Sequence, residues 1–333
     1  MTARRTIALG AVLLVLAGCQ GAQTPLSPSA DQAGAVFGLL QLMLCICGFM
    51  YLLVLGFLGW AIWRGRRSLQ PDPDAADAGL KLSLGVWAGV IVLGLTVLTI
   101  GSFLVDRSLA QAAAREQLVV RVTGQQWWWR IAYRPPGSQT WVETANELHL
   151  PVGRTARIEL GSADVIHSFW VPNVAGKMDV IPGHPNAMDV TPRRLGWFRG
   201  QCGEFCGLQH AHMALDVKVE SPQAFQAWLQ AQAQPAQTPA DPTAARGMQV
   251  LTTGACGACH VVRGTSAAGR VGPDLTHLAS RRSIAAGLMP FSRGAVQGWI
   301  AEPAALKPGT NMPAVSLSPS DANAVAAYLA GLK

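Results

Sequence analysis

Hydrophobic and polar positions give the first third of the chain a simple pattern of two long uncharged runs. They extend from Ala33 to Trp63 and from Leu82 to Val105, and each is longer than the ~20 residues that a helix needs to cross a bilayer. Three arginines directly follow the first run, and loops with such an excess stay on the cytoplasmic side. The pattern therefore predicts a transmembrane hairpin over residues 33–107 with both of its ends outside the cytoplasm.

A different pattern begins after the second run, where short stretches rich in β-branched residues alternate with Gly and Pro. Several such strands with turns between them are typical of a β-sandwich, which we expect over residues 115–233. The predicted strands are Leu118–Thr123, Thr155–Leu160, Val165–Trp170 and Ala214–Glu220. A short amphipathic helix that begins at Pro222 closes this part of the chain.

Polar residues with Pro form a linker, residues 234–241, ahead of a final helical domain, residues 242–333. Asp241 followed by Pro242 has the pattern of a helix N-cap and first helical position. The last helix is expected to begin after a cap at Ser318. The expected fold class is thus a multidomain membrane protein with a two-helix hairpin, a β-sandwich and an all-α domain.

The chain opens with a leader, residues 1–19, in which a charged start precedes an apolar core. Its end, Leu16-Ala-Gly-Cys19, has the form of a bacterial lipoprotein cleavage site, and Cys19 would then be the lipid-modified first residue. Ordinary signal cleavage nearby, with Cys19 incidental, is the alternative. Residues 20–32 are interpreted as a tether. Either form of cleavage places the mature N-terminus outside the cytoplasm, in agreement with the hairpin.

Composition agrees with a membrane protein, because half of the residues are hydrophobic and only 14% are charged. The seven cysteines lie in separate motifs and do not suggest a disulfide framework. Cys45 and Cys47 fall in the first apolar run, where a free cysteine packs as a small apolar residue. The net charge of +7 is concentrated in the leader, one short loop and the C-terminal domain, and it does not indicate nucleic-acid binding.

The densest group of metal-binding side chains lies in Gln-Cys-Gly-Glu-Phe-Cys-Gly-Leu-Gln-His-Ala-His-Met, which begins at Gln201. It supplies two thiols, Cys202 and Cys206, followed by His210 and Met213. Thiolate, imidazole and thioether are the donors that suit copper in electron transfer, and two thiols at this spacing can bridge two metal ions. A disulfide would leave the histidine and methionine without a role, and zinc rarely takes a methionine ligand. Copper is therefore favoured over both alternatives.

A second stretch, Ser162-Ala-Asp-Val-Ile-His167-Ser-Phe-Trp-Val-Pro172, offers a further imidazole. Alone, a histidine beside aromatic residues is usually a core residue. The motif Asp-Val-x-His-Ser-Phe, the loop Cys-x-Glu-x-Cys-Gly-x-x-His-x-x-Met and the aromatic run Gly124-Gln-Gln-Trp127-Trp-Trp together resemble subunit II of cytochrome c oxidase. The resemblance covers nearly the whole chain after the leader.

The resemblance implies a cupredoxin-like Greek-key β-sandwich that carries the binuclear copper centre CuA. Glu204 would bind copper through its backbone carbonyl, and its carboxylate would face a magnesium ion shared with subunit I. The side-chain ligands implied by the match are His167, Cys202, Cys206, His210 and Met213.

The resemblance also gives a role to one tryptophan. Trp127 matches the surface aromatic through which electrons enter from cytochrome c, whereas Trp128 and Trp129 are expected to fill the core and cover the membrane-facing end. In the family, a Glu three residues before a Trp in the second span is associated with a proton path. Here that Trp corresponds to Trp87 and the position is Leu84, so no proton-path residue is assigned.

The final domain contains Cys256-Gly-Ala-Cys259-His260, the attachment signature of a c-type haem. Cys256 and Cys259 would form the thioethers, and His260 would be an axial iron ligand. A thioredoxin-like motif would not need the histidine and belongs to an α/β context. Met312 is the expected second axial ligand, in preference to Met289, and Met/His ligation raises the haem potential. The domain resembles a class I cytochrome c, as found fused to subunit II in some bacterial oxidases.

These motifs predict the subunit through which electrons enter a proton-translocating cytochrome c oxidase of the bacterial inner membrane, with both cofactor domains on the periplasmic side. Electrons would pass from cytochrome c or another donor to haem c, to CuA and to the haem–copper site of subunit I, which reduces oxygen to water. Oxidase subunits I and III and membrane lipid are the expected partners, and nucleic acid is not. The oxygen-reducing site is not expected in this chain.

The alternative is a membrane-anchored CuA/haem c electron-transfer protein that serves another reductase, but the helical hairpin argues against it. A copper-delivery protein would not need a haem domain, and a quinol oxidase subunit lacks the cysteines.

The segment from Ala240 has eight Lys/Arg and four Asp/Glu, and the segment from Arg115 to Phe225 has eleven Lys/Arg and ten Asp/Glu. In the family that the chain resembles, members that receive electrons from a separate basic cytochrome present an acidic patch. This sandwich has no strong acidic excess, so we expect the tethered haem to reduce CuA directly.

Overall fold

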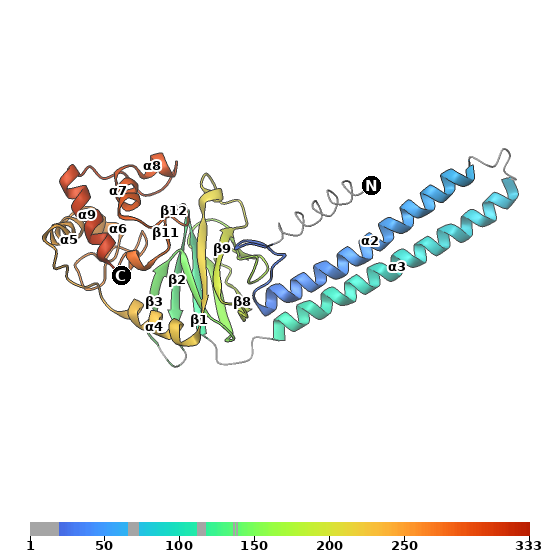
Figure 1. Cartoon of the computed structure of the whole chain (residues 1–333), viewed down its shortest axis with the longest axis horizontal. Helices are drawn as coiled ribbons and strands as arrows, with labels where there is room; N and C mark the ends of the chain where they lie inside the picture. The colour runs from blue at the N-terminus through green and yellow to red at the C-terminus, as the bar shows by residue number, and fades with distance from the viewer. Residues whose placement is uncertain (1–19, 66–72, 112–117, 136, 138) are drawn as a thin grey trace, which may run out of the picture. The chain divides into compact units, whose positions relative to one another are not determined.

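The computed structural model describes the chain except for residues 1–19, 66–72, 112–117, 136 and 138. The predicted leader with Cys19 therefore lies outside the described residues. The chain divides into two compact units (Figure 1), one formed by residues 34–114 and the other by residues 1–33 together with 115–333.

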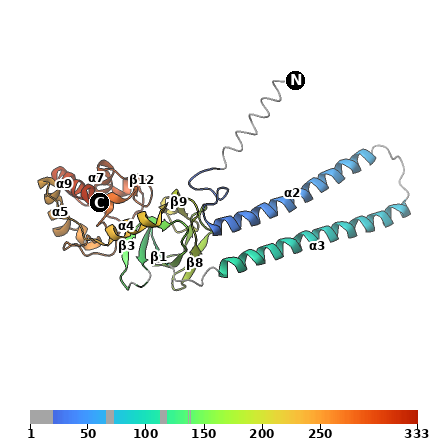
Figure 2. The ribbon, with the colours of Figure 1, turned by 60° about the horizontal axis from the view of Figure 1, so that its bottom comes forward.

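Two long helices, α2 (Asp31–Gly65) and α3 (Pro73–Gln111), contain the predicted transmembrane runs. They run side by side in Figures 1 and 2 and touch through small residues, since a Cβ at Gly101 would lie 2.9 Å from Leu42. Large apolar side chains such as Leu52 and Leu82 are about two-thirds exposed, at 67% and 72%. Both helices are long and apolar enough to cross a membrane, as predicted.

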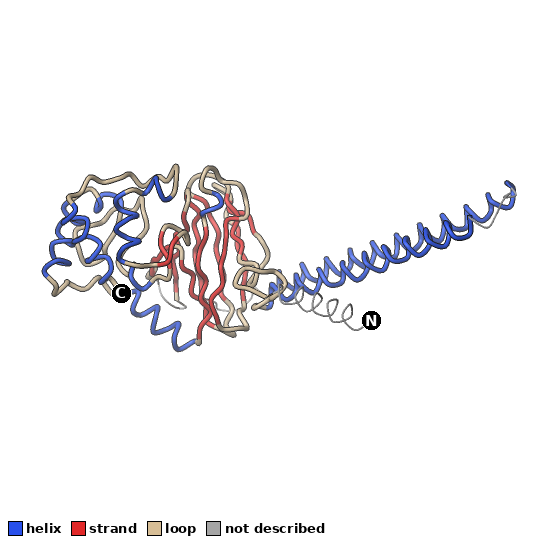
Figure 3. The backbone as a smooth tube through the Cα atoms, turned by 45° about the horizontal axis from the view of Figure 1, so that its top comes forward, coloured by secondary structure: helices blue, strands red, loops and turns tan. Residues whose placement is uncertain are grey.

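The second unit contains a sandwich of two five-stranded sheets, whose strands are red in Figure 3. The first sheet has the order β3 (Val142–Ala145), β2 (Trp128–Arg134), β1 (Leu118–Gln125), β5 (Ala156–Ser162), β8 (Asn186–Val190). The second has the order β4 (Glu147–Pro151), β10 (Ala214–Glu220), β9 (Gly196–Cys202), β6 (His167–Trp170), β7 (Met178–Val180). The pairs β1–β5 and β4–β10 are parallel and the others antiparallel. The cupredoxin-like fold is therefore confirmed.

Alternating positions of the strands fill the space between the two sheets, as the period of a strand requires. On β1, Val120 and Val122 are fully buried while Arg121 between them is exposed. On β2, the fully buried residues are Trp129, Ile131 and Tyr133. This core makes the sandwich a rigid support for the loops at its ends.

The segment predicted as a tether, residues 20–32, packs on the sandwich. Asn173 donates hydrogen bonds from its side chain to the carbonyl oxygens of Gly21 at 3.0 Å and Ser27 at 2.9 Å. Ala30 forms a β-bridge to the sandwich and is only 5% exposed. The Pro- and Ser-rich composition thus belongs to an extended segment whose backbone groups bond to the folded domain.

The C-terminal domain is built around α5 (Pro242–Thr253), α7 (Arg293–Ala301) and α9 (Pro319–Gly331), which follow the last sandwich helix, α4 (Pro222–Ala233). Its smaller elements are α6 (Cys256–Cys259), η2 (Leu278–Ser280), β11 (Ser283–Ile284), β12 (Met289–Pro290) and α8 (Pro303–Leu306). Both predicted caps are present. Asp241 Oδ2 accepts a hydrogen bond from the Ala244 amide at 2.9 Å, and Ser318 Oγ accepts one from the Asp321 amide at 3.1 Å.

Candidate copper and haem sites

The loop between β9 and β10, here called the copper loop (residues 202–213), gathers the predicted donor groups around two sulfur atoms. Cys202 Sγ and Cys206 Sγ lie 3.7 Å apart. His167 Nδ1 is 3.9 Å from the first sulfur, and His210 Nδ1 is 3.6 Å from the second. Met213 Sδ lies 3.8 Å from Cys206 Sγ. Two thiols, two imidazoles and a thioether therefore converge, and this donor set has the softness that copper prefers.

Neighbouring strands hold these donors in place. His167 is the first residue of β6 and Cys202 the last of β9, and the two strands pair so that Phe169 lies opposite Cys202. The Cys202 amide donates to the carbonyl oxygen of Met213 at 2.8 Å, which closes the loop at its base. One turn, η1 (His210–His212), brings the second imidazole back toward the sulfurs. Groups far apart in the sequence thus meet at one end of the sandwich.

Asp164 orients the first imidazole. Its Oδ1 lies 2.8 Å from His167 Nε2, so Nε2 carries the proton and Nδ1 faces Cys202. Burial by itself lowers the pKa of His167, but the hydrogen bonds with Cys202 and Asp164 outweigh burial and leave the pKa raised. A carboxylate behind a ligating histidine fixes its ring and increases its basicity.

The two thiols have opposite proton affinities. The hydrogen bond between the two thiols is the largest influence on Cys202 and lowers its pKa well below the usual thiol value, with His167 acting in the same direction against burial. The same hydrogen bond and burial raise the pKa of Cys206. Both thiols must be deprotonated to bind metal, so metal binding releases protons.

Two other residues of the copper loop, Glu204 and His212, make different contacts. The backbone oxygen of Glu204 lies 3.2 Å from Cys202 Sγ, while its carboxylate reaches Lys177 Nζ at 3.4 Å. His212 Nδ1 lies 2.8 Å from Gln209 Oε1. His212 therefore stays outside the group of donors, which agrees with its lack of a predicted role.

Trp127 departs from the expected surface position. It is only 8% exposed, because the C-terminal domain covers it. Its Nε1 donates to the carbonyl oxygen of Cys206 at 3.0 Å. Gly207, at φ +111°, leaves room for the indole, since a Cβ there would lie 3.1 Å from the ring. The tryptophan thus packs directly on the copper loop.

The other two tryptophans, Trp128 and Trp129, lie in different surroundings. Trp129 is completely buried in the core, as expected, and stacks edge-on against Phe169 with ring centres 5.9 Å apart. Trp128 points to the opposite side and lines a cavity of the C-terminal domain. The expectation that it covers the membrane-facing end is therefore wrong, because side chains on a strand alternate in direction.

That cavity has a volume of about 420 Å³ and contains the predicted haem-attachment residues in its lining. Residues 125–128 of the sandwich close one side of it. Most of the remaining wall is apolar, as a macrocycle requires. The lining includes Leu251, Cys256, Cys259, His260, Val296, Ile300, Met312, Val325 and Leu329. All four predicted haem contacts thus face the same space.

His260 is fixed in the orientation that an axial ligand needs. Its Nδ1 lies 2.8 Å from the carbonyl oxygen of Pro273, so Nδ1 donates and Nε2 is left unprotonated. Burial lowers the pKa of His260 and keeps the ring neutral. Gly272 lies flat against the imidazole, because a Cβ there would come within 2.5 Å of the ring.

The two methionines considered from the sequence lie in different surroundings. Met312 lines the cavity, whereas Met289 belongs to β12 and packs against the core of the domain. The structure thus places the expected methionine, and not its rival, in the wall of the cavity.

Sequence reasoning missed two residues of these sites. Asp164 stands three positions before His167, and this spacing was a usable signal. Lys307 is 3% exposed and donates from Nζ to three carbonyl oxygens beside the copper loop. A single lysine in a loop carries no pattern that would reveal such a position.

The fold and the two sites define a class: a membrane-anchored cupredoxin-like domain joined to a cytochrome c domain. The family model "Cytochrome C oxidase subunit II, periplasmic domain" matches residues 134–220, and the model "Cytochrome c" matches residues 244–333. Cytochrome c oxidase subunit 2 of Alkalihalophilus pseudofirmus is 30% identical to the chain, over 100% of this chain and 98% of the relative. The chain belongs to the cytochrome c oxidase subunit II family.

A second curated relative agrees. Cytochrome c oxidase subunit 2 of Bacillus subtilis is 29% identical, over 99% of this chain and 98% of the relative. A crystal structure of the periplasmic domain of subunit II of cytochrome oxidase from Bradyrhizobium japonicum is 32% identical, with a TM-score of 0.32, over 35% of this chain and 93% of the other. Family membership implies copper in the sandwich, haem in the C-terminal domain, a membrane anchor and further oxidase subunits as partners.

Proposed function

We propose that this chain is the subunit through which electrons enter a terminal, proton-translocating cytochrome c oxidase. The chain takes electrons from cytochrome c or another respiratory donor at a covalently bound haem c. It passes them through binuclear CuA to the haem–copper site of subunit I, where oxygen is reduced to water. Cofactors of this kind carry single electrons, and the protein supplies their position and potential.

The geometry of the two sites supports the residue roles that we propose. In the sandwich, His167, Cys202, Cys206, His210 and Met213 hold the two copper ions, with the backbone oxygen of Glu204. The Glu204 carboxylate is 46% exposed in its side chain and is free to contribute to a magnesium site with subunit I once it leaves Lys177. In the C-terminal domain, Cys256 and Cys259 carry the haem, and His260 and Met312 bind its iron.

One observation carries this proposal: Trp127 belongs to both sites. Its Nε1 donates to the carbonyl oxygen of Cys206 at 3.0 Å, and the residue lines the cavity that also contains Met312. The residue expected to receive electrons is thus covered by the tethered domain and is not accessible to a separate cytochrome. We therefore assign the role of donor to the copper site to the tethered haem.

The linker between the sandwich and the C-terminal domain keeps the proposed haem close to the copper loop. Residues 234–241 join the two domains in one chain, so the haem domain stays near the copper loop without diffusion, and even a short flexible linker would give an effective concentration of about a millimolar. An external donor then needs to reach only the haem domain. We place both domains on the periplasmic side of the bacterial inner membrane, with lipid and subunits I and III as neighbours. In this proposal, Cys19 is the lipid-modified first residue after cleavage of the leader.

A chain that ends at Gln234 tests the route. In the purified complex, oxygen uptake driven by soluble cytochrome c should fall strongly, because no haem remains beside Trp127. Uptake driven by a small reductant that reduces copper directly should persist, which controls for an intact copper loop. Undiminished uptake with soluble cytochrome c would contradict the proposed route.

Purification separates this function from the alternative, an electron-transfer protein that serves another reductase. The proposed function requires that the chain co-purifies with a subunit carrying haem and CuB and that the complex consumes oxygen. Co-purification with a different reductase and no oxygen uptake would favour the alternative.

A further inference from the structure

Lys307 is a buried cation at the contact between the C-terminal domain and the copper loop. It follows α8 and precedes the loop that carries Met312, and it is only 3% exposed. Its Nζ donates to the carbonyl oxygens of His212 at 2.8 Å, Trp127 at 2.9 Å and Ala285 at 3.1 Å. An ammonium group has three N–H donors, so each donor has a carbonyl acceptor.

The three acceptors come from three separate segments. Trp127 lies between β1 and β2 and packs on Cys206, and His212 lies in the copper loop beside Met213. Ala285 belongs to the C-terminal domain itself. One side chain therefore ties the haem-cavity wall to both segments of the sandwich that enclose the copper donors.

The turn that contains Ala285 is shaped for this contact. Ala285, Ala286 and Gly287 all have positive φ, at 55°, 62° and 75°, a conformation that is uncommon for alanine. Their carbonyl oxygens accept in turn from Lys307 Nζ, from the Ala214 amide at 3.1 Å and from Arg199 Nη1 at 3.1 Å. A left-handed turn thus presents three consecutive acceptors, two of them to the sandwich.

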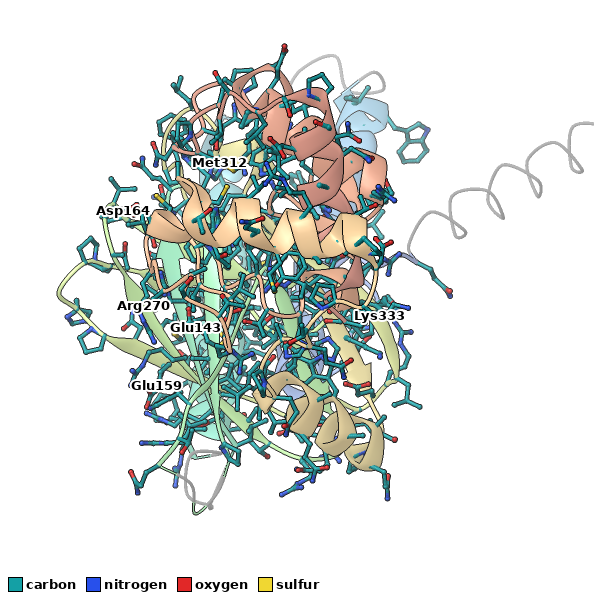
Figure 4. The ribbon with its side chains drawn as sticks, turned by 90° about the vertical axis from the view of Figure 1, so that its left-hand side faces the viewer. Glu143, Glu159, Asp164, Arg270, Met312 and Lys333 are labelled. Atoms are coloured by element: carbon teal, nitrogen blue, oxygen red, sulfur yellow. The ribbon has the colours of Figure 1, made fainter. Side chains whose placement is uncertain are left out.

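Lys307 differs from the other cations at this contact. Arg270 lies at the rim, where its side chain is 75% exposed and its Nη1 is 3.7 Å from Glu143 Oε2 (Figure 4). Exposed pairs of this kind contribute little. Lys307 takes part in none of the ion pairs found among the described residues, and burial lowers its pKa to about 8. A buried cation without a carboxylate partner is costly unless all its donors are bonded.

We propose that Lys307 is the positioning residue that fixes the haem domain against the copper loop for electron transfer. This inference rests on the proposed function. Transfer of one electron at this contact would oxidise the haem iron from ferrous to ferric and reduce the copper pair by one electron, with no atom or proton transferred. Loss of the three charge-assisted hydrogen bonds would let the Met312 loop separate from Trp127, and transfer would slow.

The test compares Lys307→Met with Arg270→Met in the complete oxidase complex. Both substitutions remove a cation from the same contact, one buried and one at the rim. After rapid reduction of the haem, the haem-to-copper rate in K307M should fall by about tenfold or more, because charge-assisted hydrogen bonds are among the stronger polar contacts. The rate in R270M should stay within about twofold of the wild type.

A second readout separates positioning from general damage. Photoreduction of the copper centre by a small ruthenium complex bypasses the haem, so the onward step to subunit I should be unchanged in K307M. Lys307→Gln retains two N–H donors without the charge and should show a smaller loss than K307M. The haem absorption and copper EPR spectra should match the wild type in both.

Three results would overturn the inference: equal rates in K307M and R270M, slowing of both electron-transfer steps, or loss of the copper signal in both Lys307 variants. The last would make Lys307 a structural residue of the copper loop. A wild-type complex in which haem and copper exchange no electron would refute the proposed function itself, and this outcome is distinct from the other three.

Discussion

The copper loop and the haem cavity are both proposed sites for a redox metal, but their residues are arranged differently. In the copper loop, five donor side chains on strand ends and one short turn already lie 3.6–3.9 Å from their neighbours around two sulfurs. In the haem domain, the proposed ligands His260 and Met312 face a cavity of about 420 Å³ that the sandwich helps to close. The proposed copper site is therefore preorganised within one domain, whereas the proposed haem site shares a wall with the sandwich.

The difference has a physical consequence. Converging donors on a rigid sandwich keep nearly the same geometry in both oxidation states, so little rearrangement accompanies each electron. The haem domain, by contrast, contacts the sandwich through side chains of its own, such as Lys307, which bonds to the carbonyl oxygens of Trp127 and His212. Changes to the copper loop should thus abolish a centre, whereas changes at the shared wall should alter transfer between two intact centres.

The largest effect should come from the sulfur pair. Cys202→Ser removes the thiol that lies 3.7 Å from Cys206 Sγ and next to His167. We expect copper loading and oxygen uptake to fall by more than ~100-fold, beyond the loss typical of outer-shell changes. Copper analysis and oxygen electrode measurements check this. Cys45→Ser, in α2, is the matched control and should behave as the wild type.

The next effect tests the haem side. Met312→Leu removes the proposed thioether ligand, and the haem potential should fall by on the order of 0.1 V, because methionine ligation raises it. Redox titration with optical detection measures this change. Met289→Leu should leave the potential unchanged, since Met289 packs in the core. An equal drop in both variants would contradict the assignment.

The copper donors could be predicted from sequence because they form a compact motif. Within Cys202 to Met213, spacing alone places four of the donor side chains, and the family resemblance added His167. The membrane helices and the caps at Asp241 and Ser318 were equally local, since each depends on a pattern of neighbouring residues.

Features that depend on contact between domains could not be predicted. The burial of Trp127 and the position of Lys307 depend on how the C-terminal domain packs on the sandwich. The sequence of a strand or loop does not show which other part of the chain it will contact. Strands β2, β3, β4, β7, β8 and β9 of the sandwich were not predicted from the sequence. In β2 and β9, tryptophans and arginines dilute the β-branched pattern. Residues 20–32 were interpreted as a tether because composition does not reveal which backbone carbonyl groups accept hydrogen bonds, such as those that the Asn173 side chain donates.

A smaller effect should follow from the residue behind the first imidazole. Asp164→Asn keeps a hydrogen-bond acceptor for His167 but removes the charge, so copper affinity should fall by about 10- to 100-fold. Competition with a copper chelator measures it. Glu159→Gln, which alters a surface pair with Arg121 at 3.2 Å, should leave the affinity unchanged. If both variants bind copper as the wild type does, Asp164 has no orienting role.

The smallest effect should follow from the loss of one hydrogen bond at the wall that the two domains share. Trp127→Phe removes the Nε1 donor to the carbonyl oxygen of Cys206, which keeps its bond from Gln126 Nε2 at 2.8 Å. The free energy of unfolding should fall by about 0.5–1.5 kcal/mol, with a small change in the copper spectrum. Denaturant unfolding and EPR check both. Trp128→Phe should leave the copper spectrum unchanged, because Trp128 faces the haem cavity.

In the proposed function, Cys202 and Cys206 join two copper ions into one electron carrier. EPR of the purified wild-type complex, combined with copper analysis, tests it most directly. We predict a hyperfine pattern from one unpaired electron shared equally by two copper nuclei. A pattern from a single copper nucleus would contradict the account.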